Sequence, residues 1–201
     1  GKTNILMGFL AGLDITTGNE NTVIGSRALG TATTATFNVA IGGDAMFGVP
    51  SGQAVSGVVA VGLEALKGTV NTTTAVDNSV AIGNASLKSL TSGTGNVAVG
   101  YQTLDGIAGA HYNTAVGYQA LTAQNTNGNI HNTGIGNKAG LAITSGIENT
   151  AVGSLALSAL VSGNYNTAVG KDALSAVEGS ASNNIGIGRS AGYNITTGGD
   201  N

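Results

Sequence analysis

Few residues of this chain could do chemistry, and they are spread along its whole length. The 201 residues include ten aspartates and glutamates, two histidines and no cysteine. Carboxylates such as Glu20, Asp77, Glu148 and Asp200 stand far apart in the sequence. Hydrolysis of a glycan needs two carboxylates in one site, and the carboxylates here are not clustered. We therefore predict no catalytic residues and a protein that is not an enzyme.

The two histidines are the next candidates for chemistry. His111 and His131 stand just before Asn113 and Asn132 in successive segments of the chain, so they could approach each other. Two imidazoles without a cysteine or a nearby carboxylate are too few for a metal site, and we interpret them as solvent-facing loop residues. Gly186-Ile187-Gly188 lacks the strand, turn, helix and acidic residue of a nucleotide site. We expect neither a metal nor a cofactor.

A repeat dominates the chain and must position any site. The unit reads Asn-(Thr/Val)-Ala-(Val/Ile)-Gly-x-x-Ala-Leu and is clearest from Asn113 to Leu121 and from Asn166 to Leu174. A period of 17 to 21 residues indicates a solenoid, in which each coil covers the apolar side of the next. We predict that residues 1–201 form a single eleven-coil solenoid, a segment of a longer fibre protein. The repeated glycine stands at Gly8, Gly25, Gly42, Gly62, Gly83, Gly100, Gly117, Gly136, Gly153, Gly170 and Gly188.

The first part of each unit has the alternation of a short strand. With the asparagine as position 1, position 4 is apolar in every copy, and position 2 falls on the same side. We expect position 4 to form a buried column. Position 3 is mostly alanine, so a neighbouring backbone could approach it, within the coil or from another subunit. We expect self-association through position 3 or through the alanine at position 8. The glycine at position 5 turns a corner.

The second part of the unit changes period. Alanine at position 8, leucine at position 9 and an apolar residue at position 12 are typical of one or two helical turns, with a bent second strand as the alternative. The predicted fold class is a repeat solenoid, mainly β. It is parallel and β-roll-like or β-helix-like, with one short strand plus a short helical turn or second strand per coil of 17–21 residues.

Position 1 is asparagine in nine of the eleven copies. One amide per coil can stack as a hydrogen-bonded ladder that satisfies the backbone at the corner. The alternative is a row that binds sugar or ions. The predicted structural ladder consists of Asn4, Asn21, Asn38, Asn96, Asn113, Asn132, Asn149, Asn166 and Asn184.

The amino-acid composition argues against several classes of binding partner. The net charge is −3 and only 8% of residues are charged, with no basic run, which argues against nucleic acid and anionic membrane surfaces. No stretch reaches the roughly 20 apolar residues of a membrane span, so we expect no membrane insertion. Apolar residues make up 41% of the chain and keep register with the repeat, which excludes disorder.

The motif Asn-Thr-Ala-Val-Gly-Tyr-Gln-Ala-Leu and the segment Asn-Ser-Val-Ala-Ile-Gly at residues 78–83 carry a resemblance to two groups of fibres. The chain resembles repeat regions of bacteriophage tail fibres, and also the β-roll head of trimeric autotransporter adhesins. The tail-fibre pattern fits better, because these coils are longer than those of the adhesin head. The resemblance implies an extracellular homotrimer on a virion or cell surface, a fibre that mediates attachment through a glycan or protein receptor. The alternative is a purely structural extracellular filament subunit without a specific receptor site.

Three coils are longer than the rest. The extra residues fall at 47–57, 67–78 and 122–131, in the same phase of the repeat, so they should emerge along one edge of the rod. Insertions on one face of a solenoid often form its binding face, although neutral surface loops are the plainer interpretation. The receptor-contact candidates are Pro50, Asn71, Thr72, Thr73, Thr74, Asn125, Asn127 and His131.

Overall fold

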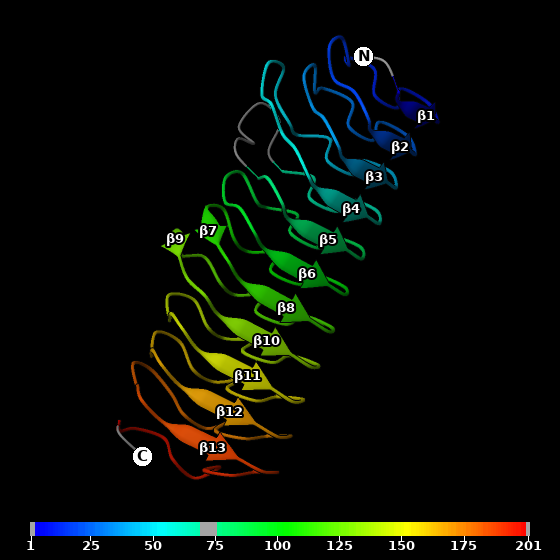
Figure 1. Cartoon of the computed structure of the whole chain (residues 1–201). Coiled ribbons are helices and arrows are strands. Elements are labelled where there is room, and N and C mark those ends of the chain that lie inside the picture. The colour runs from blue at the N-terminus through cyan, green and yellow to red at the C-terminus, as the bar shows by residue number, and fades with distance from the viewer. Residues whose placement is uncertain (1–2, 69–75, 200–201) are drawn as a thin grey trace.

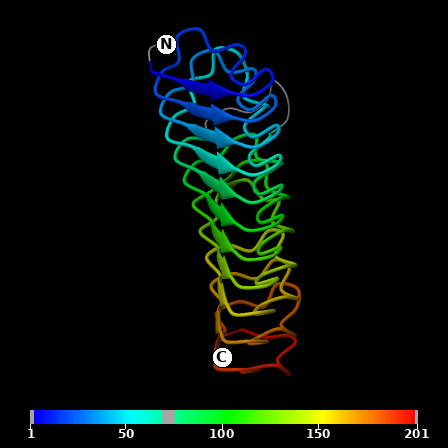
Figure 2. The ribbon, with the colours of Figure 1, turned by 90° about the vertical axis from the view of Figure 1, so that its right-hand side faces the viewer.

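The protein is a rod-shaped parallel β-solenoid (Figure 1). The computed structural model describes residues 3–68 and 76–199. Eleven three-residue strands form one sheet along the rod, and they are stacked in a single column from the N-terminal to the C-terminal end (Figure 2). These strands are β1 (Ile5–Met7), β2 (Thr22–Ile24), β3 (Val39–Ile41), β4 (Val59–Val61), β5 (Val80–Ile82), β6 (Val97–Val99), β8 (Thr114–Val116), β10 (Thr133–Ile135), β11 (Thr150–Val152), β12 (Thr167–Val169) and β13 (Ile185–Ile187).

The register of the sheet follows the repeat. Each strand pairs in parallel with the equivalent residues of its neighbours, as Ala151 does with Ala168. Val59 pairs with Val80, so a 21-residue step keeps the same register as a 17-residue one. The extra residues therefore leave the strand untouched. The predicted parallel, mainly β solenoid is confirmed.

The glycine at position 5 allows the coils to stack. Its φ lies between 121° and 135° in all eleven copies. In the first ten copies a Cβ would come within 3.0 Å of the backbone of the equivalent glycine in the next coil. Both the backbone conformation and the close approach therefore require glycine at this corner.

The return segment of each coil is a series of turns, and the described residues contain no helix. Positions 7 and 9 have φ between 46° and 64°, which a right-handed helix does not allow. The amide of Gln119 at position 7 donates to Tyr101 of the preceding coil, and that of Leu121 at position 9 donates to Ala139 of the next. The expected short helical turn is therefore not formed, because these amides point along the stack and hydrogen bond to neighbouring coils.

The core is a thin layer between the strands and the return segments. Ala115, Ala151 and Ala168 at position 3 are fully buried, as are the leucines at position 9, such as Leu121. A Cβ on Gly134, at position 3, would lie 2.8 Å from Leu121 Cγ, so position 3 faces the leucine of position 9 across this layer.

The prediction that position 4 forms a buried column is wrong. Its side chains point outward and are half-buried or exposed in every coil. Position 3 and the alanine at position 8, such as Ala120, lie inside, so neither can be a subunit contact as expected. The leucines occupy most of the space between strand and return segment, and only a small residue fits opposite them.

Candidate functional site

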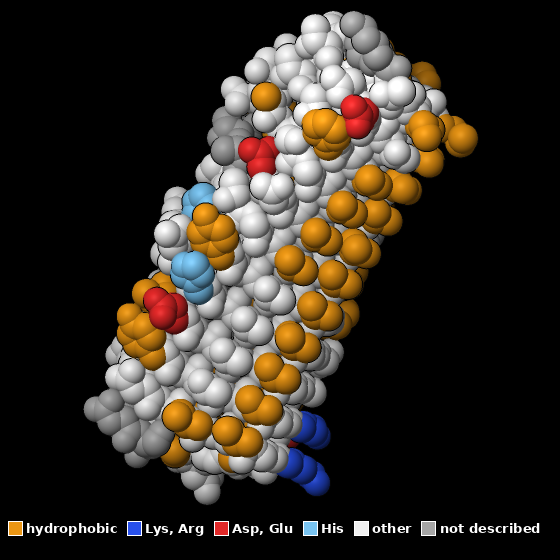
Figure 3. Space-filling model, in the orientation of Figure 1, with side chains coloured by type: hydrophobic (Ala, Val, Ile, Leu, Met, Phe, Trp, Pro, Cys, Tyr) orange, Lys and Arg blue, Asp and Glu red, His pale blue; other side chains and the backbone are white. Residues whose placement is uncertain are grey.

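The outward side of the sheet is an apolar surface, defined here as the outer face and made of positions 2 and 4 of the eleven strands. It contains no charged residue. Its apolar side chains form two parallel columns in the N-terminal half of the rod and continue as a single column in the C-terminal half (Figure 3). The outer face consists of Ile5, Thr22, Val39, Val59, Val80, Val97, Thr114, Thr133, Thr150, Thr167 and Ile185 at position 2, and of Met7, Ile24, Ile41, Val61, Ile82, Val99, Val116, Ile135, Val152, Val169 and Ile187 at position 4.

The outer face changes character halfway along the rod. Position 4 is valine or isoleucine from β2 to β13. Position 2 is valine in β3, β4, β5 and β6, but threonine in β8, β10, β11 and β12. None of these last four hydroxyl groups, which belong to Thr114, Thr133, Thr150 and Thr167, takes part in a hydrogen bond among the described residues. The C-terminal half of the face therefore combines an apolar column with a row of free hydroxyl groups.

A second row runs beside the outer face, at the residue before position 1, which we call position 0. From the second coil onward its φ lies between 55° and 70°. Glycine and asparagine suit this left-handed conformation and occupy four of the copies, whereas bulkier residues occupy the other six. In chain order the row is Glu20, Phe37, Gly57, Asn78, Gly95, Tyr112, His131, Glu148, Tyr165 and Asn183.

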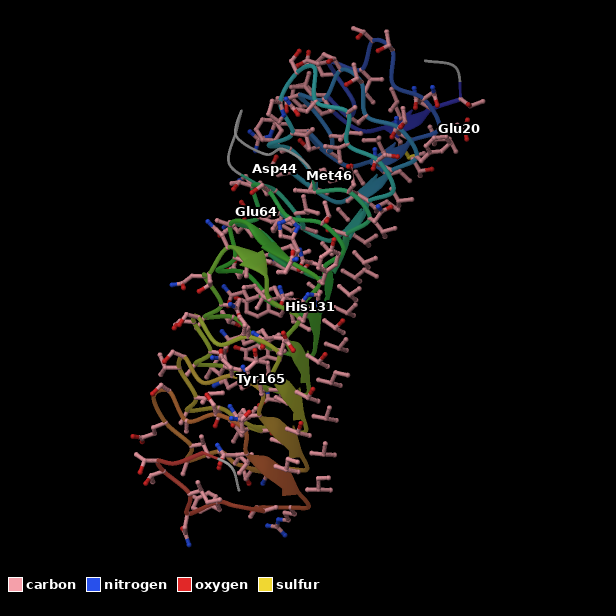
Figure 4. The ribbon with its side chains drawn as sticks, turned by 60° about the vertical axis from the view of Figure 1, so that its left-hand side comes forward. Glu20, Asp44, Met46, Glu64, His131 and Tyr165 are labelled. Carbon is pink, nitrogen blue, oxygen red and sulfur yellow. The ribbon has the colours of Figure 1, made fainter. Side chains whose placement is uncertain are left out.

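Four consecutive residues of this row form what we call the aromatic strip: Tyr112, His131, Glu148 and Tyr165. The Tyr112 and His131 rings are stacked, with centroids 5.2 Å apart and planes 14° apart. Tyr112 is 49% exposed and Tyr165 is 50% exposed, and Glu148 is exposed between His131 and Tyr165. Figure 4 labels His131 and Tyr165 on neighbouring parts of the rod.

Aromatic side chains lie outside the core of this protein. All five tyrosines are exposed, and the fully buried large side chains are leucine, isoleucine and methionine. A second pair, Tyr101 and Tyr118, is stacked at position 6, with centroids 5.4 Å apart. The tyrosines therefore contribute surface rather than packing volume, which is typical of residues that contact a partner.

Eight of the nine asparagines of position 1 are buried, and the asparagines of successive coils are hydrogen bonded to one another. Oδ1 of Asn132 accepts from the backbone amide of Asn149 at 2.8 Å and from its Nδ2 at 3.2 Å. Nδ2 of Asn149 also donates to the Gly163 carbonyl. The column is interrupted at Val58 and Ser79. Because these amides are buried and paired with protein groups, they cannot serve as the alternative sugar-binding row.

Charged residues form a ladder in the N-terminal half. Arg27 and Asp44 pair at 2.7 Å, Lys67 lies between Asp44 and Glu64, and Lys88 pairs with Glu64 at 2.7 Å. Asp44 and Glu64 lie in neighbouring coils (Figure 4). Hydrogen bonds from Lys67 and Lys88 lower the pKa of Glu64 to about 2. Both carboxylates, Asp44 and Glu64, are held by cations from other coils, so the ladder acts as a structural clamp between coils.

One other carboxyl lies near the end of this ladder. Burial raises the pKa of Asp105, and this effect outweighs the opposing influence of Lys88. The negative charge of Glu64 also raises the pKa of Asp105, and Glu64 itself is paired with Lys67 and Lys88.

The predicted receptor contacts fall into three groups. Asn71, Thr72, Thr73 and Thr74 lie outside the described residues. Pro50 is half-buried in the 47–57 segment, whereas Asn125, Asn127 and His131 are exposed. Segments 47–57 and 122–131 both extend on the side of the rod away from the glycine corners (Figure 1). Only His131 among these candidates meets an aromatic ring in the described structure.

The 122–131 segment is built into the fold rather than protruding freely. Its β9 (Gly128–Asn129) pairs in parallel with β7 (Ala110–His111). Gln124 is fully buried, and its Oε1 accepts a hydrogen bond from Asn132 Nδ2 at 2.7 Å. This insertion therefore supports the asparagine column and presents its exposed residues from a fixed backbone.

Sequence reasoning did not single out Tyr112 or Tyr165, and it considered Glu148 only as one of the scattered carboxylates. Their common feature is that each directly precedes the asparagine of a repeat, as His131 does. This shared position in the repeat is the sequence feature that could have identified them. Their exposure and the ring stacking depend on the coil-to-coil spacing, which the structure supplies.

The rest of the described surface offers no enclosed chemical site. No group of three or more His, Cys, Asp or Glu side chains in the described ranges is placed to hold a metal ion. Residues 3–68 and 76–199 contain no helix long and apolar enough to cross a membrane. A recess at the last coil, lined by 178–183 and 197–199, contains one carboxylate, Glu178, and otherwise small or uncharged residues.

Comparison with known protein families, with characterised proteins and with solved structures finds no match to this chain.

Proposed function

We propose that this chain is the shaft of an extracellular attachment fibre in which three copies associate side by side through the N-terminal half of the outer face. The observation that carries the proposal is the apolar character of that half, where positions 2 and 4 are both valine or isoleucine from β3 to β6. The number of copies, the extracellular location on a virion or cell surface and the attachment role rest on the resemblance to tail-fibre and adhesin repeats.

The outer face is expected to pack against another protein surface. Parallel sheets occur with both faces packed, and here the return segments of each coil cover only the inner face. The residues on the outer face are β-branched and apolar at position 4 in ten of eleven strands. A contiguous apolar surface of this length is typical of a protein interface, because isolated soluble proteins rarely expose one.

A second copy of the chain fits this face better than an unrelated protein. The face contains no charge, so bringing two such faces together leaves no ionic group desolvated. The strands keep one register, so the valine columns of β3 to β6 in two rods side by side can match coil by coil. In coils four and six, position 0 is Gly57 and Gly95, whose lack of a side chain leaves the edge of the valine columns open there, whereas coils three and five carry Phe37 and Asn78 at this position.

Sedimentation velocity tests the association. The chain is expected to sediment as a trimer at micromolar concentration. Val99→Asp places a charge on the outer face and is expected to give a folded monomer, whereas Gln53→Asp, in an exposed segment, is the matched control and is expected to remain trimeric. A monomeric parent chain, or a Val99→Asp variant that stays trimeric, contradicts the proposal.

Adsorption of the fluorescently labelled trimer to cells tests the attachment role. Specific, saturable adsorption supports an attachment fibre. A stable trimer that adsorbs to none of the cells tested supports the alternative, a purely structural extracellular filament subunit.

A further inference from the structure

We propose that the aromatic strip, together with the threonine hydroxyls beside it, binds a neutral polysaccharide laid along the rod. The inference rests on the proposed attachment function and names the ligand class and its place. Four consecutive coils carry the strip residues Tyr112, His131, Glu148 and Tyr165 at position 0. The same four coils carry Thr114, Thr133, Thr150 and Thr167 at position 2.

The strip residues are placed where the fold does not favour them. Position 0 requires a left-handed backbone, which is strained for an L residue with a side chain and is unstrained for glycine. Equivalent coils have glycine at position 0, as at Gly57 and Gly95, or asparagine, as at Asn78 and Asn183. Their backbone there has the same left-handed conformation. Tyr112 and Tyr165 pack in no core and are about half exposed, so folding does not account for their rings.

The rings offer flat surfaces that repeat along the rod. Tyr112 and His131 stack nearly parallel in neighbouring coils, so together they make one platform. Tyr165 stands two coils beyond His131 and supplies a second. A pyranose ring presents a face of C–H groups that packs on an aromatic ring, and a polysaccharide repeats that face at regular intervals. A periodic protein surface therefore suits a periodic ligand.

The polar groups beside the rings match the edges of a sugar. The hydroxyl groups of Thr133, Thr150 and their two equivalents make no hydrogen bond with described residues, so each is free to donate and accept. The exposed Glu148 carboxylate adds an acceptor between His131 and Tyr165. Sugar hydroxyls are both donors and acceptors, and they can pair with both kinds of group.

The charged residues at the strip favour a neutral polysaccharide over an anionic one. Neither position 0 nor position 2 of the four coils carries lysine or arginine, the residues that bind carboxylate, sulfate or phosphate groups. Glu148 repels an anion. A second copy of the rod is a poorer occupant of the strip itself, since it would bury the carboxylate and the hydroxyls without partners.

Affinity electrophoresis in native gels tests the inference on the full chain. The gels contain dextran, galactomannan, mixed-linkage β-glucan or, as the anionic probe, dextran sulfate. Retardation is expected in at least one neutral gel and not in dextran sulfate. The double variant Tyr112→Asn, Tyr165→Asn is expected to bind about tenfold more weakly or worse. Asparagine suits position 0, so the backbone should be retained, and Phe37→Asn is the matched control in the same row outside the strip.

The outcomes separate this inference from the proposed function. A trimer that adsorbs to cells but is retarded in no neutral gel, or only in dextran sulfate, overturns the inference and leaves the fibre intact. A double variant that binds like the parent also overturns it, as does one that loses self-association instead of binding, because the strip is then a subunit contact. If the chain is monomeric but is retarded in a neutral gel, polysaccharide binding by the strip is supported and the proposed trimeric shaft is wrong.

Discussion

The side-chain oxygen of Asn149 accepts two hydrogen bonds from Asn166, one from its backbone amide and one from its side-chain amide, each 3.0 Å long. Both residues are buried. The same pair of bonds joins most successive asparagines of the column, so each coil satisfies the amide groups of the next. Outside the two coils that carry Val58 and Ser79, the column therefore holds successive coils in register through hydrogen bonds.

Replacing one asparagine should destabilise the stack at that point. Asn149→Ala removes the acceptor and leaves the backbone N–H of Asn166 and one of its two Nδ2 hydrogens unpaired, at a cost of about 1–3 kcal/mol for each. Chemical denaturation is expected to show a loss of about 2–6 kcal/mol in the free energy of unfolding. Asn125→Ala, at an exposed position, should change it by less than about 0.5 kcal/mol. Equal stability of the two variants would show that the column is dispensable.

Glycine at the corner should tolerate no side chain within the stack. Gly117→Ala places a Cβ within 3.0 Å of the Gly136 backbone, so the two coils must separate. The melting temperature is expected to fall by several degrees or the chain to fail to fold. Gly188→Ala has a similar φ, but its nearest neighbour would be Ala191 Cβ at 4.0 Å. This control should cost much less, and a similar loss in both variants would assign the effect to backbone conformation alone.

Neighbouring residues of one strand should respond in opposite ways to enlargement. Ala115→Leu overpacks the thin core and is expected to cost about 1–3 kcal/mol or more. Val116→Leu enlarges an outward side chain and should leave the stability of the monomer nearly unchanged. Thermal unfolding followed by circular dichroism in dilute solution measures both. If Val116→Leu lowers thermal stability as much as Ala115→Leu does, the side chain at position 4 is packed in the core.

The charge ladder should stabilise the rod in a defined pH range. The pKa of Glu64 falls from 4.5 to about 2 on folding, so the folded state favours the ionised form. This contribution is fully present above pH 4.5 and is lost as pH falls toward 2. Glu64→Gln is expected to lower stability by about 1 kcal/mol at pH 7, with the difference from the parent shrinking below pH 4.5. A difference that persists unchanged at pH 2 would point to packing rather than charge.

The sequence alone determined the repeat, the parallel stacking and the position of the corner. These depend on local rules: a β-branched alternation, a glycine where a Cβ cannot fit, and one asparagine per coil. The coil period also placed the long insertions outside the strands, which is why Val59 and Val80 pair in register despite their 21-residue separation. Each of these features follows from aligning the successive units of the repeat.

Only the tertiary structure decided which side of the strand is inside. Positions 3 and 4 are both apolar, and hydrophobicity favours burying the larger residue. The choice depends instead on the distance between the strand and its return segment. Leu121 and its equivalents at position 9 occupy most of that layer, so alanine faces inward and valine outward. The same spacing between coils brings Tyr112 onto His131, two residues 19 apart in sequence. Neither the thickness of the core nor the stacking of rings on neighbouring coils can be read from the period of the repeat.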